Sequence, residues 1–506
     1  MFYISFKFCY FNASLTRVAR KHKLVETYTE ANAKVLLELF KFTKQHVNGL
    51  LMKYKTLHKK ETAELIESYQ LCQKMGFTKE DLLKYPRLFL YHPVINYHHS
   101  CLFKDAGIKK IDAPLLCRSK FYLRNKISTF KEQKYLQPDE NIVDNLLSCL
   151  KPSIEKPNKL NEALEDIDEK SLTQIHETIL IDWLKTKLKI TNEDLSKLLR
   201  IHKMIKNKSF TVINENIALA KSVGLKKPKI LKCGYLLNNY PEYPKTMLQD
   251  SPHFAGVDFA KAYKNNPKLM MINPRKIKEI YAILKEHEVP DEMIRNKPNV
   301  FTLSPITLKK RLGAIKNTPE FEVFSKDPQM LTLVLGYEKA VTRLSFLKKL
   351  KLRCTSLSHI NLPDADSFLD YIQEGKDINS THSAVKFFST LLDKTRQDVY
   401  KILRKHPYYN CVPFLDIERT FQYLKMAGYT KDNIARSLLI LLYPDSKVHL
   451  VMNQLREDEY LQFGNLSQHK QLQLVLYRIE KEYHFTGKGI WSNIVKTDQM
   501  DEKLLE

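Results

Sequence analysis

Apolar and polar residues along most of this chain alternate with the period of an α-helix. Between residues 276 and 285 the apolar side chains form one stripe, made of Ile277, Ile280, Tyr281, Ile283 and Leu284. Residues 341–355 place Leu344, Leu347 and Leu350 on one face. Because residues three and four apart share a helix face, these stripes predict amphipathic helices, each with one side in a core.

Glycine and threonine mark where these helices end and restart. The segments around Gly76 and Gly428 read alike, and each glycine is followed two residues later by a threonine, Thr78 or Thr430. Glycine readily takes the left-handed conformation that closes a helix, and threonine caps the start of the next one. The pattern therefore predicts two consecutive helices joined by a short turn.

Prolines recur behind the second of these helices. Pro267, Pro298 and Pro328 are 31 and 30 residues apart. Each is followed by any residue and then two apolar ones, as in Pro86-Arg87-Leu88-Phe89 and, more loosely, Pro407-Tyr408-Tyr409. Proline ends a helix, and we expect the apolar pair to return to the core. A period near 30 built from short helices predicts an all-α fold, namely an α-solenoid.

Composition supports helix and points to a polyanionic partner. Of the 506 residues only 13 are Gly, which disfavours Gly-rich β folds and doubly wound nucleotide-binding folds, and hydrophobic residues make up 43%, enough for a core. The 82 Lys and Arg against 57 Asp and Glu give a net charge of +25. Charge of this size favours binding to nucleic acid, to an anionic membrane surface or to an acidic protein, and nucleic acid is the leading interpretation.

Charge also varies along the chain. Residues 1–25 are basic, contain no acid and include hydroxylic residues, which is typical of a mitochondrial presequence; a secretory signal and an ordinary basic N-terminus are the alternatives. The predicted segments are a presequence (1–25), N-terminal helical repeats (26–137), an acidic linker or degenerate repeats (138–210), C-terminal basic repeats (211–450) and an acidic tail (451–506).

Several other classes of protein are disfavoured. Eight cysteines are scattered without CxxC spacing, so neither a disulfide scaffold nor a zinc ribbon is expected, and a reducing compartment fits. His98, His99 and Cys101 lie close in sequence, but they are expected to be ordinary core and edge residues because no second cluster completes a metal site. Neither a membrane span, a catalytic motif nor a cofactor is predicted.

The repeats resemble those of a known family. Gly76-Phe77-Thr78-Lys79-Glu80-Asp81-Leu82, followed by Tyr85-Pro86-Arg87-Leu88-Phe89, is similar to the repeats of the mitochondrial transcription termination factor (mTERF) family, and the layout over about 61–445 is most like that of arthropod members. The resemblance implies a right-handed α-solenoid of three-helix repeats in the mitochondrial matrix that binds double-stranded mitochondrial DNA. It also implies base contacts from arginines and stacking from aromatic residues, although no family position is matched residue by residue here.

Three basic clusters are the candidate nucleic-acid contacts. Together with their neighbours Lys316, Lys351 and Lys401, the candidates are Lys309, Lys310, Arg311, Arg343, Lys348, Lys349, Arg353, Lys394, Arg396, Arg404 and Lys405. Phosphates along a duplex need a track of cations, and an arginine fork can read guanine. Phe301, Phe346 and Tyr400 are candidates for stacking on bases, although helical spacing more often places such residues in a core.

The expected function is therefore regulation or termination of mitochondrial transcription by a DNA-binding protein that is not an enzyme. Two alternatives stay open. One is binding to ribosomal RNA during mitochondrial ribosome assembly. The other is an adaptor that docks on another mitochondrial transcription factor, which the acidic segments 138–170 and 451–506 would favour.

Overall fold

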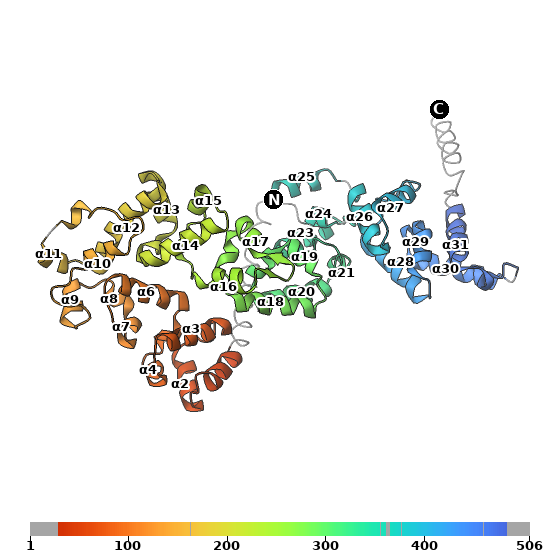
Figure 1. Ribbon diagram of the computed structural model, residues 1–506. Helices are drawn as coiled ribbons and strands as arrows, with labels where there is room; N and C mark the ends of the chain where they lie inside the picture. The colour runs from red at the N-terminus through yellow and green to blue at the C-terminus, as the bar shows by residue number, and fades with distance from the viewer. Residues whose placement is uncertain are drawn as a thin grey trace. The chain divides into compact units, whose positions relative to one another are not determined.

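The chain folds into short helices with almost no strand. The computed structural model describes residues 29–482 except 162, 355, 361–364, 376 and 459 (Figure 1). Within these residues the only sheet is a two-stranded antiparallel hairpin, β1 (His253–Phe254) and β2 (Val257–Asp258). The all-α prediction is therefore confirmed. The predicted presequence and the end of the predicted tail, 483–506, lie outside the described residues.

The described helices belong to two compact units, which divide at Leu284 and Lys285, with Ser304–Ile306 counted in the first. The first unit contains α2 (Lys44–Lys53), α3 (Thr62–Lys74), α4 (Lys79–Lys84), α5 (Arg87–Leu90), α6 (Pro93–Asp105), α7 (Ala113–Cys117), α8 (Ser119–Tyr122), α9 (Ile127–Glu132), α10 (Ile142–Ser148), η1 (Asn158–Leu160), α11 (Leu164–Asp168), α12 (Leu172–Leu188), α13 (Asn192–Ile201), η2 (Lys203–Asn207), α14 (Phe210–Ser222), α15 (Lys227–Lys232), η3 (Gly234–Asn238), α16 (Glu242–Asp250), α17 (Phe259–Asn265), η4 (Pro267–Met271) and most of α18 (Pro274–Glu286).

The second unit contains α19 (Asp291–Asn296), η5 (Pro298–Thr302), most of α20 (Pro305–Lys316), α21 (Pro319–Glu322), α22 (Met330–Leu335), α23 (Tyr337–Lys349), α24 (Leu357–Ile360), α25 (Ala365–Gln373), α26 (Thr381–Leu392), α27 (Arg396–Leu403), α28 (Phe414–Met426), α29 (Lys431–Arg436), η6 (Leu438–Leu442), α30 (Asp445–Glu457), η7 (Phe463–Asn465) and α31 (Gln468–Glu482). Segments named η are 3-10 helices.

A three-part repeat recurs in both units. A long helix is followed by a short helix and then by a 3-10 turn, as in α14–α15–η3, α18–α19–η5 and α28–α29–η6. Proline opens the third part in two of the repeats: η4 begins at Pro267 and η5 at Pro298, after the preceding helix has ended at Asn265 or Asn296. The period near 30 that the sequence predicts is thus one such repeat.

The predicted helix ends are confirmed. Gly76 (φ 77°) and Gly428 (φ 90°) take the left-handed conformation. Thr78 accepts a hydrogen bond from the amide of Asp81 and completes a capping box, and Thr430 caps α29 by accepting from the amide of Asn433. At the equivalent place in another repeat Glu288 takes φ 56°, a conformation that is rare outside glycine.

The apolar pairs behind the prolines return to the core in four of five repeats. Fully or almost fully buried pairs are Leu88 and Phe89, Leu269 and Met270, Val300 and Phe301, and Met330 and Leu331. The looser fifth case was predicted wrongly, because Tyr408 is 54% exposed and Tyr409 is partly exposed. A tyrosine pair can keep its hydroxyl groups in water, so this position does not demand burial.

A buried hydrogen bond within the repeat recurs at the seventh residue of long helices. The side chain there donates to a carbonyl at the end of a short helix 17 to 24 residues further on. The pairs are Asn216 with Asn239 (2.9 Å), Arg311 with Val334 (2.9 Å) and Leu335 (3.0 Å), Arg343 with Ile360 (2.8 Å), and Thr420 with Tyr443 (2.8 Å). We call this the repeat clasp. It satisfies carbonyls that a helix end leaves without partners.

The first unit also contains contacts between distant repeats, whereas an ideal solenoid contacts only its neighbours. Helix α6 lies against α14, where Asp105 accepts hydrogen bonds from the hydroxyls of Ser209 (2.6 Å) and Thr211 (2.7 Å). The rings of Tyr97 and Tyr240 meet edge to face with centroids 4.6 Å apart. The N-terminal repeats therefore pack on repeats that follow more than a hundred residues later.

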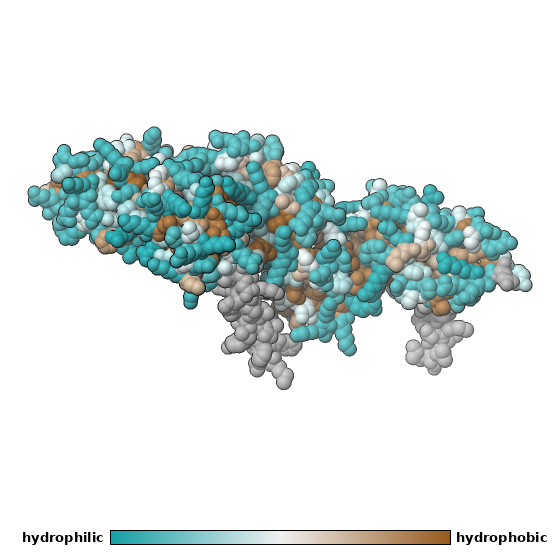
Figure 2. Space-filling view, turned by 90° about the horizontal axis from the view of Figure 1, so that it is seen from below, coloured by the Kyte–Doolittle hydropathy of each residue, from teal (hydrophilic) through white to brown (hydrophobic). Residues whose placement is uncertain are grey.

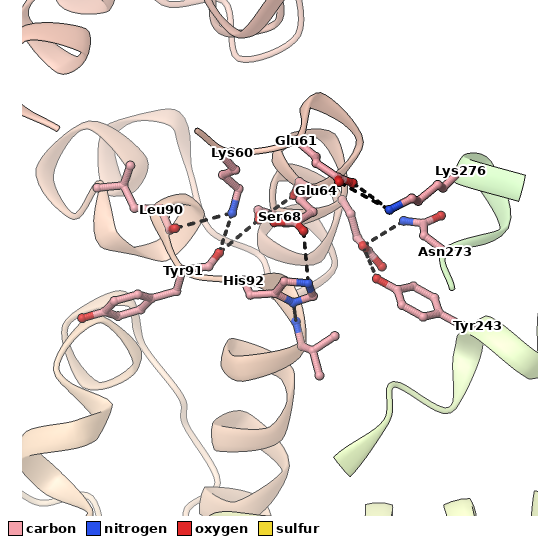
Figure 3. A network of polar contacts seen from close by, with 12 residues as sticks. Lys60, Glu61, Glu64, Ser68, Leu90, Tyr91, His92, Tyr243, Asn273 and Lys276 are labelled. Carbon is pink, nitrogen blue, oxygen red and sulfur yellow. Dashed lines mark hydrogen bonds and ion pairs between the residues drawn. The ribbon is translucent and has the colours of Figure 1, made fainter. Parts of the chain in front are cut away.

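A polar network extends this packing to α3 (Figure 3). Glu61 pairs with Lys276 at 3.3 Å. Glu67 accepts hydrogen bonds from the hydroxyl of Tyr243 and from the side-chain amide of Asn273 (3.0 Å). Burial raises the pKa of Glu67, and these two donors oppose that rise. The network ties the N-terminal half of α3 to the beginnings of α16 and α18.

The acidic segment 138–170 is folded at least in part. Helix α10 buries Ile142, Val143 and Leu146. Lys131 forms an ion pair with Asp168 at 2.7 Å. The carbonyl of Ala106 accepts a hydrogen bond from Asn145 at 3.3 Å. These contacts attach the segment to the helices that precede it.

Candidate nucleic-acid interface

Most of the surface in Figure 2 is hydrophilic. The first predicted cluster lies on α20. Lys309 and Lys310 are both exposed. Lys309 forms an ion pair with Glu286 at 3.3 Å, with more than half of each side chain exposed. Arg311 instead forms a repeat clasp. Its guanidinium is used to hold the end of α22, and we assign it a structural role instead of base reading.

The second cluster, on α23, likewise contains one arginine with a structural role and lysines on the surface. Arg343 is 5% exposed and lies over the ring of Phe368, 4.5 Å from its centroid, while it donates to Ile360. This arginine is therefore part of the core of its repeat, and the prediction that it reads a base is corrected. Lys349 is exposed, and Lys348 is paired with Glu320.

Arg353 completes the second cluster. Its guanidinium forms an ion pair with Asp416 at 2.8 Å, and the side chain as a whole is 70% exposed. Lys348, Lys351 and Arg353 line one cavity together with Glu320 and Asp416. Because the cavity carries both signs of charge, its cations are partly neutralised by the protein itself.

The third cluster surrounds α27. Lys394 pairs with Asp432 at 2.8 Å, and Lys431 pairs with Asp393. The hydrogen bond and charge of Lys394 lower the pKa of Asp432. Both pairs are solvent-exposed, and exposed pairs contribute at most about 1 kcal/mol. A phosphate can therefore replace such a carboxylate at little cost.

Five predicted cations have no acidic partner in the part of the chain that the structure describes: Lys310, Lys349, Arg396, Arg404 and Lys405. All five are exposed. They come from the middle of α20, from the end of α23 and from α27 or the residues just behind it. The clusters thus do not repeat at one equivalent position of the repeat.

The aromatic candidates divide between core and surface. Phe301 is completely buried in η5, so the structure corrects its candidacy for stacking on bases. Phe346 is 37% exposed and Tyr400 is 45% exposed. Both remain beside basic clusters, on α23 and α27.

The histidines near Cys101 are core residues. His98 Nε2 donates to the carbonyl of Asn238 at 3.1 Å, and His99 contacts the hydroxyl of Ser119 at 2.7 Å. Burial lowers the pKa of His99 to about 3 and that of His98 well below its usual value. Over the described residues, no cluster of three His, Cys, Asp or Glu side chains is placed to hold a metal ion, and no helix is long and apolar enough to cross a membrane.

One basic region was missed by the sequence analysis. Between Glu215 and Glu242 the chain has five lysines and no acid, and between Asp258 and Glu279 it has six lysines and arginines and no acid. Both stretches lie in the first unit. The signal in the sequence is the absence of acids over these stretches, whereas each of the three predicted clusters contains arginine.

Comparison with known proteins finds one relative of this chain among the curated proteins. No protein-family model and no solved structure matches it. The chain is 25% identical over 449 residues to a protein of Drosophila melanogaster named "Transcription termination factor 5, mitochondrial", and the alignment covers 87% of this chain and 79% of the relative. The alignment therefore extends over most of both units. It confirms the resemblance found in the residues: the chain is similar, over most of its length, to a mitochondrial transcription termination factor of an arthropod.

Proposed function

We propose that this chain acts in the mitochondrial matrix, where it binds double-stranded DNA and regulates or terminates transcription. The observation that carries the proposal is the match over 87% of the chain to a mitochondrial transcription termination factor. The exposed, unpaired cations of the second unit supply the chemistry, because they can neutralise phosphates along a duplex. A protein held on the duplex in this way would obstruct or position the polymerase.

The arrangement of charge supports contacts to the phosphates of the DNA backbone together with a small number of contacts to bases. Arg396 and Arg404 are the exposed arginines without an acidic partner among the candidate residues described by the structure. An arginine fork matches O6 and N7 of guanine, so these two side chains are the proposed base readers. Lys310, Lys349 and Lys405 are proposed to contact phosphates. A right-handed superhelix of the repeats would present both kinds of contact along one duplex.

Binding across a salt series tests this proposal. The affinity of the full chain for duplex fragments of mitochondrial DNA should fall steeply between about 50 and 200 mM salt, and the three lysines proposed to contact phosphates should contribute about −3 to the log–log slope. Lys310→Gln/Lys349→Gln/Lys405→Gln should make the slope shallower by about 2 to 3.

The matched control is Lys44→Gln/Lys55→Gln/Lys79→Gln, which removes three exposed lysines from the first unit and should leave the slope unchanged. Absence of duplex affinity at low salt, or an affinity that does not depend on salt, would contradict direct DNA binding. Tighter binding to structured RNA would favour the ribosomal RNA alternative. Recruitment to DNA only in the presence of another mitochondrial transcription factor would favour the adaptor alternative.

A further inference from the structure

The two stretches of the first unit that contain lysine but no acid, between Glu215 and Glu242 and between Asp258 and Glu279, meet near the C-terminal ends of α12, α14 and α17. The side chain of Lys227 donates to the carbonyl of Lys189, behind α12, at 2.5 Å. Lys229 donates to the carbonyls of Lys264 and Asn265, at the end of α17. Helix α15 therefore links the end of an earlier helix to the end of a later one.

The end of α14 lies at the same place. A side-chain carbon at Gly224 would be 3.6 Å from Cδ of Lys264, so Lys264 lies over this glycine. Lys221 lies in the last turn of α14, three residues before this glycine. We name the group formed by Lys189, Lys221, Lys226, Lys227, Lys229 and Lys264 the lysine junction.

Protein contacts account for only part of this group. A cation at a helix C-terminus is favourable, and Lys227 and Lys229 already donate to the carbonyls there. Lys221, Lys226 and Lys264 are exposed and pair with no acid in the described part of the chain. Like charges gathered without a carboxylate repel one another, so an anion from outside the protein would relieve the repulsion.

Residue type indicates what this surface can recognise. The chain has no arginine between Arg200 and Arg275, so the lysine junction contains ammonium groups alone. An ammonium group is a point charge that suits phosphate, whereas bidentate reading of guanine is mostly the work of arginine. The second unit differs because its unpaired cations include Arg396 and Arg404.

We propose that the lysine junction is a second nucleic-acid contact that binds the phosphates of a DNA duplex without reading its sequence. The proposal rests on the proposed function and extends it: the first unit anchors the backbone, and selection among sequences belongs to the second unit. Contacts to phosphate fix position and strengthen binding to every sequence equally.

The test uses the full chain with Lys221→Gln/Lys226→Gln/Lys264→Gln. Its log–log salt slope for duplex DNA should become shallower by about 2 to 3, and its affinity should fall by about tenfold or more at the lower end of the salt range. The ratio of affinities for a mitochondrial fragment and for a random duplex of equal length should stay the same. Lys221→Arg/Lys226→Arg/Lys264→Arg keeps the charge and should keep the slope.

Controls separate this inference from folding and from the proposed function. The three side chains are exposed, so the melting temperature should be unchanged, and the Lys44→Gln/Lys55→Gln/Lys79→Gln control should keep the wild-type slope. If wild type binds duplex DNA and the junction variant keeps the wild-type slope, the lysine junction is overturned alone. A changed sequence ratio, or an effect on RNA but not on duplex DNA, also overturns it. If wild type fails to bind duplex DNA, both proposals fall.

Discussion

Arg343→Ala is expected to lower the free energy of unfolding by about 2 to 4 kcal/mol. The substitution leaves the carbonyl of Ile360 without its donor, which costs about 1 to 3 kcal/mol. It also removes the cation–π contact with Phe368, worth about 0.5 to 2 kcal/mol, and the packing of a side chain that is 5% exposed. Unfolding in guanidinium chloride, followed by far-ultraviolet circular dichroism, measures the change.

Arg396→Ala is the matched control, because Arg396 is exposed and has no acidic partner among the described residues. Its unfolding free energy should stay within about 0.5 kcal/mol of wild type, while its DNA affinity should fall. The opposite pattern would contradict the assignment: a stable Arg343→Ala protein that has lost duplex binding would return Arg343 to the interface.

Acidification is expected to destabilise the protein between about pH 6.5 and pH 4. Burial lowers the pKa of His99 to about 3, and it lowers the pKa values of His176 and His406 to about 4, from 6.5. Below pH 6.5 the unfolded chain therefore binds more protons than the folded chain, and stability is lost as the pH falls towards the folded pKa values. At about pH 5 each histidine accounts for about 2 kcal/mol.

Buried acids oppose part of this loss. Burial raises the pKa of Glu480 from 4.5 to about 7, so its protonation stabilises the folded chain as the pH falls through that range. Glu67 and Asp105 act in the same direction. The expected net loss of unfolding free energy on acidification is therefore smaller than the sum of the contributions from the histidines.

A single substitution isolates the histidine contribution. His176 is fully buried, stacks on Phe210 with ring centroids 4.3 Å apart, and contacts the carbonyl of Lys206 at 2.9 Å. His176→Phe should remove about 2 kcal/mol of the difference in unfolding free energy between pH 6.5 and about pH 5. Denaturant titrations at several pH values measure it. His46→Phe, at an exposed position, should keep the wild-type pH dependence, and an unchanged pH dependence in His176→Phe would contradict the account.

The parts of the fold that the sequence predicted are governed by local chemistry. Gly76, Thr78 and Pro298 each impose a backbone conformation or remove a donor, so the ends of helices and the beginning of η5 follow from neighbouring residues. The buried pair of Val300 and Phe301 follows for the same reason. These are short-range effects that a single sequence displays.

The errors in the candidate site come from contacts that local patterns do not show. A run of basic residues does not reveal that Arg311 and Arg343 turn to carbonyls 17 to 24 residues away while Lys310 and Lys349 remain exposed. Position within the helix is the signal that was available, because both arginines occupy the seventh residue, where other repeats have Asn216 or Thr420.

Contacts between distant repeats could not be predicted from the sequence. Glu61 and Lys276 are 215 residues apart, and no periodicity links them. The same holds for Asp105 and Thr211, 106 residues apart. The lysine junction is intermediate, since its acid-free composition is visible in the sequence but the meeting of the ends of α12, α14 and α17 is not.

The central claim is that this chain contacts mitochondrial DNA in its own compartment. Crosslinking in intact mitochondria, followed by purification of the chain and sequencing of the attached DNA and RNA, tests it most directly. The account predicts that duplex mitochondrial DNA is recovered at defined positions, in excess over ribosomal RNA. Recovery of ribosomal RNA in place of DNA, or of neither, would contradict it.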